Sequence, residues 1–593
     1  MSIVPRGMSV TEAYRLYRSG NLLVNRKYQR KLVWTVAEKE RLIGSILKGY
    51  PIPLILLAER PQIHGSGKYE IIDGMQRLNA IFSFIENLFM FEENFFDVDE
   101  FSYAKQLVDD GIFDLEEENN KQLLSRKECA DVLDYQLAVT IYTAMEEEDI
   151  TEVFNRINSG GKHLSRQERR QAGVTTSFAE LVRTIAMELR GDVSQKVLRL
   201  PEMPEISIDS KQSNQGYKIK AEDTIWCKQG ALTILQLRES EDEQIIADIV
   251  ASILLHKPLP VSTERLDGLY DQTTRYFQDI ESALATYGFK KLAQEIINTF
   301  AIMRETIEAY NSEPKCLLHI VNPKSNNPIR TAFYTIFMAF FDLIIRQNLF
   351  PADPTGIMNA LRGLQQKLDL SRHYTTTEDR ERNINQTKGL IQNCFAKREP
   401  SVLGHGVELT LDFENSLRRS RIETTRYECK QGLLDLSANR SLNSDLLVRI
   451  VETICGIANL GSEMDGYIHI GVTDSKQDAD RIEKLDRIQP IEINGRYVVG
   501  IDRKAKLQNK TIEQYVKLIT DAIQKSILCE PLRTQVLTKF DTISYKGFSV
   551  IRITIPAQNT VSFIGKTAFT RKDSSTIQVE GPELLAIFQL FQK

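Results

Sequence analysis

The most constraining feature of this sequence is the octet at residues 70–77, Glu-Ile-Ile-Asp-Gly-Met-Gln-Arg, because the apolar periodicity changes at its centre. A short apolar strand precedes Asp73 and Gly74, and apolar residues at helical spacing follow from Leu78 to Ile85. Glycine permits a tight turn, and an aspartate beside it is placed to cap the new helix. The octet therefore predicts a strand, a turn and a helix in immediate succession.

This turn has the chemistry of a phosphate site. The start of a helix exposes N–H groups and a partial positive charge, which suit an anion. Arg77, one turn into the helix, adds a planar cation that can bind phosphate oxygens in pairs. The alternative is an ordinary strand, turn and helix with an arginine at the surface, and the octet alone leaves it open.

Further blocks surround the octet in a fixed order. They are Tyr-Gln-Arg to Trp at 28–34, Ser-Ile-Leu-Lys-Gly-Tyr-Pro-Ile-Pro at 45–53, and Phe-Asn-Arg-Ile-Asn-Ser-Gly-Gly at 154–161, followed by Leu-Ser-Arg-Gln-Glu at 164–168. Ser165 and Glu168 have the spacing of a capping box. This order resembles the N-terminal domain of GmrSD-type modification-dependent restriction proteins, a ParB-like domain. The resemblance extends through a helical region to about residue 398.

The resemblance implies a ParB/sulfiredoxin-like α+β core that binds or hydrolyses a nucleoside triphosphate. The family motif is Asp-Gly-Gln-Gln-Arg, and here Met75 replaces the first glutamine. Methionine cannot hydrogen-bond like an amide, so this departure bears on base recognition and turnover more than on phosphate contact. The candidate nucleotide-binding residues are Asp73, Gly74, Gln76 and Arg77, with Arg30 as a second phosphate ligand.

Composition narrows the class of protein. The net charge of −5 gives no general affinity for nucleic acid, so any such binding must come from local basic patches. Seven cysteines without a Cys-x-x-Cys pair argue against a zinc cluster or a disulfide framework and fit a reducing cytoplasm. The most apolar run, 332–345, is shorter than the roughly 20 residues of a membrane span. We therefore expect a cytoplasmic protein with no membrane partner.

A chain of 593 residues is too long for a single core. We expect an α+β multidomain protein with a first domain at 1–175, a helical region at 176–398, a linker at 399–412 and a second α+β domain at 413–593. Pro400, Gly404 and Gly406 interrupt the helical pattern at the linker. Within the helical region, apolar spacing predicts helices at 178–189, 245–255, 266–277, 292–309, 330–346 and 356–368.

The last domain contains a second ordered set of blocks. They are Glu-Thr-Thr-Arg-Tyr-Glu-Cys-Lys at 423–430, Ala-Asn-Leu-Gly at 458–461, a strand at 466–472 that leads to Asp474, a strand at 547–555, and Arg-Lys-Asp-Ser-Ser-Thr at 571–576. This series resembles the Schlafen AlbA-like domain, a divergent nucleic-acid-binding fold. Two positions depart from the family pattern: the turn after Asn459 is longer, and Asp573 replaces a glycine.

Some members of that family only bind nucleic acid, and others are metal-dependent endoribonucleases. Carried over by position, the catalytic and metal-binding carboxylates are Glu423, Glu428 and Asp474, which would hold Mg²⁺ or Mn²⁺, and Lys430 would neutralise the scissile phosphate. The alternative is that Glu423 and Glu428 pair with neighbouring arginines. The basic residues Arg426, Arg571 and Lys572 are the candidate nucleic-acid contacts.

Both resemblances together imply a prokaryotic anti-phage or restriction-type protein. In this hypothesis a nucleoside triphosphate or a modified-DNA feature is sensed by the first domain, and DNA or RNA is bound, and cleaved, by the last. A second hypothesis is a non-enzymatic, nucleotide-responsive regulator that binds DNA or RNA. A third is a structural partner that needs another subunit for catalysis. Relatives of both domains often self-associate, so a homo-oligomer is one alternative, and the sequence leaves the oligomeric state open.

Overall fold

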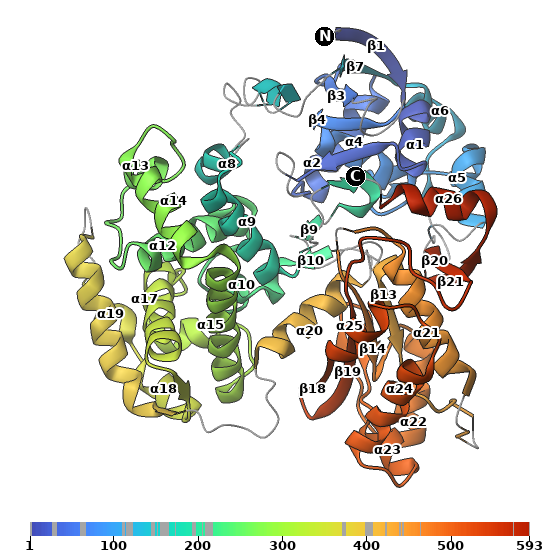
Figure 1. Ribbon diagram of the computed structural model, residues 1–593. Coiled ribbons are helices and arrows are strands. Elements are labelled where there is room, and N and C mark those ends of the chain that lie inside the picture. Colours follow the sequence, from blue (N-terminus) through green and yellow to red (C-terminus); the bar gives the residue numbers. More distant parts are fainter. Residues whose placement is uncertain are drawn as a thin grey trace. The chain divides into compact units, whose positions relative to one another are not determined.

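The computed structural model divides the chain into two compact units, Met1–Arg398 and Glu399–Lys593. The residues that it describes are 3–26, 32–59, 67–109, 113, 122–143, 149–150, 152–154, 165–171, 174–192, 197–203, 205–207, 218–369, 375–397, 407–420, 424–437, 440–441, 444–462, 464–572 and 574–591. Both units mix helices with sheets, which confirms the α+β multidomain class (Figure 1).

A six-stranded mixed sheet organises the beginning of the first unit. Its order is β1 (Ile3–Ser9), β7 (Gln136–Thr143), β3 (Ile55–Glu59), β4 (Tyr69–Asp73), β2 (Leu22–Asn25) and β8 (Val197–Arg199). The β3–β7 and β2–β4 pairs are parallel, and the other three pairs are antiparallel. Since β8 lies beyond residue 175, this sheet continues past the boundary predicted for the first domain.

Four helices occur between the strands of this sheet in chain order: α1 (Val10–Arg18), α2 (Val36–Leu47), α4 (Met75–Ile85) and α6 (Arg126–Asp134). Helix α4 follows β4 after the single residue Gly74, so the strand, turn and helix predicted from the octet are confirmed. The apolar positions of α4 are buried as their spacing predicts, from Leu78 at 2% exposure to Ile85 at 0%.

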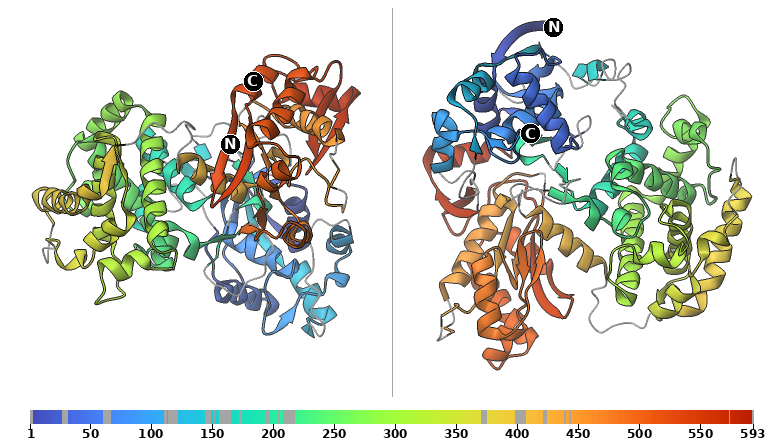
Figure 2. Two further views of the ribbon diagram at one scale, coloured as in Figure 1. Left: turned by 90° about the horizontal axis from the view of Figure 1, so that it is seen from below. Right: turned by 180° about the vertical axis from the view of Figure 1, so that it is seen from behind.

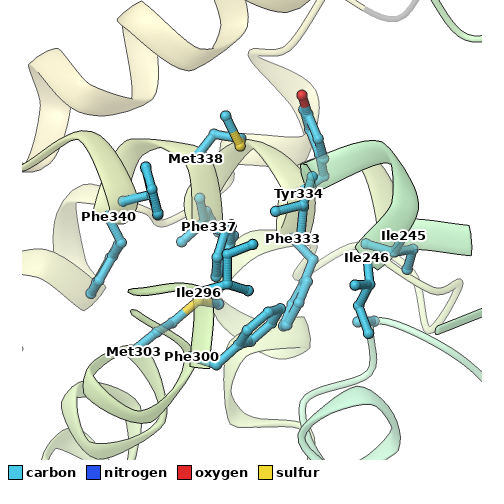
Figure 3. Close-up of a cluster of buried hydrophobic side chains, with 14 of the residues drawn as sticks. Ile245, Ile246, Ile296, Phe300, Met303, Phe333, Tyr334, Phe337, Met338 and Phe340 are labelled. Atoms are coloured by element: carbon cyan, nitrogen blue, oxygen red, sulfur yellow. The ribbon is translucent and has the colours of Figure 1, made fainter. Parts of the chain in front are cut away.

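The rest of the first unit is a helical bundle. Its longer helices are α9 (Ser177–Arg190), α12 (Glu241–Leu254), α14 (Arg275–Tyr287), α15 (Phe289–Tyr310), α17 (Arg330–Phe341) and α19 (Thr377–Ile391). Aromatic and aliphatic side chains of α12, α15 and α17 interlock in its core, where Phe300 lies 4.3 Å from Phe337 between ring centroids (Figure 3). The green and yellow helices stay side by side in both views of Figure 2.

Two predicted helices of this bundle are wrong. The helix predicted at 356–368 ends at Ala360 in α18 (Pro354–Ala360), and a separate 3₁₀ turn follows at Leu364–Gln366. The other is the helix predicted at 266–277. Residues 266–277 form two helices, because α13 (Thr263–Gly268) ends and α14 begins only after Thr274. The Asp271 carboxylate accepts hydrogen bonds from the N–H and hydroxyl of Thr273, and the Thr274 hydroxyl accepts from the Phe277 N–H. These local bonds make a turn followed by a helix cap, and they outweigh the continuous apolar spacing.

A four-stranded sheet forms the centre of the second unit. Its order is β13 (Tyr427–Lys430), β14 (Gly466–Ile470), β19 (Phe548–Ile555) and β18 (Phe540–Tyr545), with only β13 and β14 parallel. Helices α21 (Ser444–Ala458), α24 (Ile512–Lys525) and α25 (Leu532–Thr538) share a core with one face, which includes Ile468 and Ile470. Helix α20 (Val407–Arg419), which begins within the predicted linker, packs Phe413 against His469 on the other face.

A hairpin of β20 (Ala568–Lys572) and β21 (Ser575–Val579) completes the second unit beside α21, followed by α26 (Gly581–Gln589). Gly456 of α21 permits this approach, since a Cβ there would lie 3.2 Å from Thr576 and 3.3 Å from the Thr570 carbonyl oxygen. Among the helices of the described residues, none is both long enough and apolar enough to cross a membrane.

Candidate functional site

The turn between β4 and α4 is built around Gly74. Its φ of 98° and ψ of 7° lie in the left-handed region, and a Cβ at this position would come within 2.9 Å of Ile55. Gly74 is itself the N-cap residue of α4 and gives the helix no side-chain cap. Asp73 therefore ends the strand and does not cap the helix as predicted, which leaves the first turn of α4 without a carboxylate cap.

Asp73 and Arg77 form an ion pair across this turn. The Arg77 Nη2 atom lies 2.8 Å from Asp73 Oδ2 and also donates to the Leu54 carbonyl oxygen at 3.0 Å. The Arg77 side chain is 15% exposed, whereas the Asp73 side chain is 40% exposed. Among the described residues, the buried Nε of Arg77 has no hydrogen-bond partner. The arginine is thus held at the mouth of the helix by its own turn.

Gln76 is oriented toward another part of the chain. Its Oε1 atom accepts hydrogen bonds from the N–H groups of Val33 at 3.1 Å and Trp34 at 3.3 Å. The side chain therefore fixes the segment that follows the Tyr-Gln-Arg block. Arg30 lies outside the described residues, as does the Asn-Arg-Ile-Asn-Ser-Gly-Gly block at 155–161. The capping box of Ser165 and Glu168 is confirmed by reciprocal bonds of 2.8 and 3.2 Å.

The candidate site of the second unit is centred on Glu428, in strand β13. Its two carboxylate oxygens contact two different cations: Lys430 Nζ at 2.6 Å and Arg571 Nη1 at 2.8 Å. The Arg571 side chain is 1% exposed and the Glu428 side chain is 13% exposed, so this is a buried ion pair. Lys430, at 32% exposure, covers its outer side.

Arg571 uses its remaining N–H groups to join three segments. It donates to the Thr576 hydroxyl at 3.0 Å and to the carbonyl oxygens of Thr425 and Tyr427 at 3.3 Å. The residue predicted to contact nucleic acid therefore lies inside the domain, where it fastens β20 to β13. Arg426 likewise donates to the carbonyl oxygens of Leu460 and Met464, while Lys572 is exposed.

Asp474 lies just after β15 (Val472–Thr473), with its side chain 56% exposed. The Arg496 Nη1 atom lies 3.6 Å from Asp474 Oδ2. Burial raises the pKa of the intervening Cys429 thiol to about 12; Arg496 and Lys430 lower it, and Asp474 and Glu428 raise it. Both carboxylates therefore act on one buried group, although the structure records no direct contact between them.

Two family models match the chain, one in each unit. Residues 10–174 match the GmrSD restriction endonuclease N-terminal domain, and residues 423–580 match the Schlafen AlbA_2 domain. The chain joins a GmrSD-type domain to a Schlafen AlbA-like domain. The recognition drawn from the sequence blocks is thus confirmed for both parts, and it links the chain to restriction and to nucleic acids. No curated protein and no solved structure matches it.

The described residues of the AlbA-like domain do not fit a metal site. Nowhere among them do three or more histidine, cysteine, aspartate or glutamate side chains gather to hold an ion, and Glu423 lies outside them. Glu428 is already neutralised by Lys430 and Arg571, so a cation would meet positive charge there. No step of a metal mechanism follows from this arrangement.

Asn459 has a structural role in the AlbA-like domain that was not predicted from the sequence. It is fully buried at the end of α21, where its Nδ2 donates to the carbonyl oxygens of Ser562 and Phe569 at 2.9 and 2.8 Å. Its Oδ1 accepts from the Ser562 N–H at 2.7 Å. The Ala-Asn block therefore fastens helix α21 to the segments around β20. The spacing of residues in the sequence does not predict these long-range hydrogen bonds.

His469, in the central strand β14, is excluded as a general acid or base at neutral pH. It is fully buried, and its Nε2 atom lies 2.7 Å from the Ser416 hydroxyl of α20. Burial, and after it the charges of Arg552 and Arg496, lowers the pKa of His469 to about 3. The imidazole is therefore neutral and structural.

Proposed function

We propose that this chain is a restriction-type protein in which the GmrSD-type domain senses a nucleoside triphosphate or a DNA feature and the AlbA-like domain binds nucleic acid. The observation that carries this proposal is the presence of both domains in one chain. The sensing half rests on the β4–α4 turn, where Gly74 leaves the first helical turn uncapped and Arg77 stands beside it.

Nucleotide sensing is tested with fluorescent analogues of GTP and ATP on the full chain. Replacing Arg77 by Gln removes a charge-assisted contact worth about 1.5–3 kcal/mol, so affinity should fall by about tenfold or more. The matched control is Arg41→Gln, since Arg41 is exposed on α2 and its Nε donates only to the preceding turn. Equal affinities for the two variants would contradict the assignment.

Nucleic-acid binding by the AlbA-like domain is tested with labelled DNA and RNA strands of one sequence. Lys572→Gln should weaken binding and lower the salt dependence of the binding constant by roughly one ion, because Lys572 is exposed beside the buried Arg571. Lys484→Gln on α22 (Lys476–Asp486) is the control, since Lys484 is also exposed. An unchanged salt slope in Lys572→Gln removes this residue from the interface.

Metal-dependent cleavage is the second candidate function, in which Glu423, Glu428 and Asp474 hold Mg²⁺ or Mn²⁺. What favours it is the match of residues 423–580 to the Schlafen AlbA_2 domain, while the pairing of Glu428 with Lys430 and Arg571 argues against it. The assay is strand cleavage with Mn²⁺ or with chelator. Asp474→Asn is the cleanest variant because its side chain is half exposed, and exposed Asp480 of α22 supplies the control Asp480→Asn. Cleavage that survives in Asp474→Asn, or in chelator, rejects the carboxylate mechanism.

A further inference from the structure

A cavity of about 680 Å³ opens in the first unit where helix α8 (Arg166–Gln171) meets α13 and the turn after it. Three arginines of α8 line it: Arg166, Arg169 and Arg170. Two carboxylates, Asp267 and Asp271, also line it. The cavity lies next to the Leu-Ser-Arg-Gln-Glu block and shares no residue with the β4–α4 turn.

Arg170 forms the fixed wall of this cavity. Its side chain is 5% exposed, and its Nε lies 2.5 Å from Asp267 Oδ1. Its Nη1 donates to the side-chain oxygens of Gln167 at 3.3 Å and Gln244 at 3.2 Å. Arg170 is therefore immobilised between two helices, and it neutralises the carboxylate of Asp267.

Arg166 and Arg169 are the two other arginines that line the cavity, and they are the candidate ligand contacts. Both are exposed, and at a spacing of three they share one side of the helix. Arg166 donates one N–H to the Thr263 hydroxyl at 3.2 Å. For the Arg169 guanidinium, the described part of the chain records neither a hydrogen bond nor an ion pair. Two guanidinium groups therefore project at the cavity with most of their donors available.

The charged groups around the cavity have partners of their own. Asp271 is occupied by the N–H and hydroxyl of Thr273, and those two hydrogen bonds lower its pKa. Burial lowers the pKa of nearby Arg330, and the charges of Arg380 and Arg170 lower it further, in spite of its 2.6 Å contact with Glu241. The arginines of helices α8, α17 and α19 in this region are therefore each paired with a carboxylate: Arg170 with Asp267, Arg330 with Glu241 and Arg380 with Asp248.

We propose that this cavity binds a phosphate group, with Arg166 and Arg169 as the ligand-contacting cations. Two neighbouring guanidinium groups match phosphate oxygens in geometry as well as charge. Of the seven described residues that line the cavity, six are charged or polar, namely the three arginines, Thr263, Asp267 and Asp271, and the seventh is Tyr270. The phosphate comes from a free nucleotide or from a nucleic-acid strand, and the two sources are separated by experiment.

The test reads the two arginines directly. The full chain is treated with phenylglyoxal, alone and with GTP, a short single-stranded DNA or the matching RNA, and modification of each arginine is followed by mass spectrometry. A bound phosphate should slow modification of Arg166 and Arg169 by about fivefold or more, because their N–H groups become occupied. Exposed Arg362 supplies the internal control and should react at one rate throughout. The probe that protects identifies the source of the phosphate.

The double variant R166Q/R169Q completes the test. Its affinity for the protecting probe should fall by about tenfold or more, while R362Q keeps the affinity of the unchanged chain. Because the readout is local, protection of Arg169 should persist in Arg77→Gln, so failure of the proposed nucleotide site does not affect this one. Absence of protection by all three probes, or equal protection of Arg362, overturns the proposal, and so does unchanged affinity in R166Q/R169Q.

Discussion

The buried contact between Arg571 and Glu428 yields the sharpest prediction for the AlbA-like domain. Replacing Arg571 by Ala removes a side chain that is 1% exposed and that holds one carboxylate and two backbone carbonyls. Glu428 would keep only Lys430, on its outer side. Breaking one partner of a buried ion pair costs about 3–5 kcal/mol, because the remaining charge is left without compensation. We therefore expect Arg571→Ala to loosen the β20–β21 hairpin from β13.

The assay has to report on the second unit alone. The two tryptophans of the chain, Trp34 and Trp226, both lie in the first unit, so their fluorescence does not follow this change. Amide hydrogen exchange of peptides from β13 and β20 reports directly on this change in the second unit. A loss of about 3 kcal/mol corresponds to roughly 100-fold faster exchange through local opening. Lys572→Ala is the matched control, because the neighbouring Lys572 is exposed and should cost less than about 0.5 kcal/mol.

The double variant Glu428→Gln with Arg571→Ala separates the ion pair from simple loss of packing. Its cost should fall below the sum of the two single variants by about 0.5–3 kcal/mol, since no unpaired carboxylate remains. If Arg571→Ala exchanges at the rate of Lys572→Ala, or if the two costs add fully, the reasoning that places Arg571 as the clamp of Glu428 is refuted.

Three further outcomes are expected. Gly74→Ala should lower the stability of the first unit, measured by tryptophan fluorescence in urea, by more than Gly67→Ala, because both glycines have positive φ but only Gly74 would add a clash; each φ alone costs about 1–2 kcal/mol. Asn459→Ala should cost about 3 kcal/mol and speed exchange around β20, because three buried backbone groups lose their partner. Burial lowers the pKa of Lys504 to about 7. Above that pH the unfolded chain binds more protons than the folded chain, so the free energy of unfolding should rise between pH 7 and 10. Lys504→Met should remove this part of the rise.

Local pattern was enough to predict the elements that carry the first site. The change of period at Asp73 and Gly74 marks the end of β4 and the start of α4, since only a glycine accepts the φ of that turn. The N-cap of α4 was assigned to Asp73 instead of Gly74, because the two residues are adjacent and the sequence pattern fits either as the cap. Gln76 could not be placed, because its partners Val33 and Trp34 are 43 and 42 residues earlier in the chain.

The second site shows the limit of sequence reasoning more clearly. The blocks identified the AlbA-like domain, and the alternative that Glu428 pairs with an arginine was open from the start. The partner is not one of the arginines beside it: it is Arg571, from the hairpin that follows the last strands of the sheet. Spacing cannot predict such a contact, because it exists only once β20 has packed against α21 and β13.

The charge balance around Glu428 decides how the two candidate functions of the AlbA-like domain should be weighed. A carboxylate that ligates a divalent ion needs its lone pairs free, whereas Glu428 gives one oxygen to Lys430 and the other to Arg571. Without Glu428, cleavage would have to rely on Glu423 and Asp474. Of these two cations, Arg571 is buried at 1% exposure, and Lys430, at 32% exposure, is the one that a phosphate backbone could reach. The pairing of Glu428 therefore argues against the proposed cleavage, whereas the proposed binding of nucleic acid does not require this carboxylate to be free.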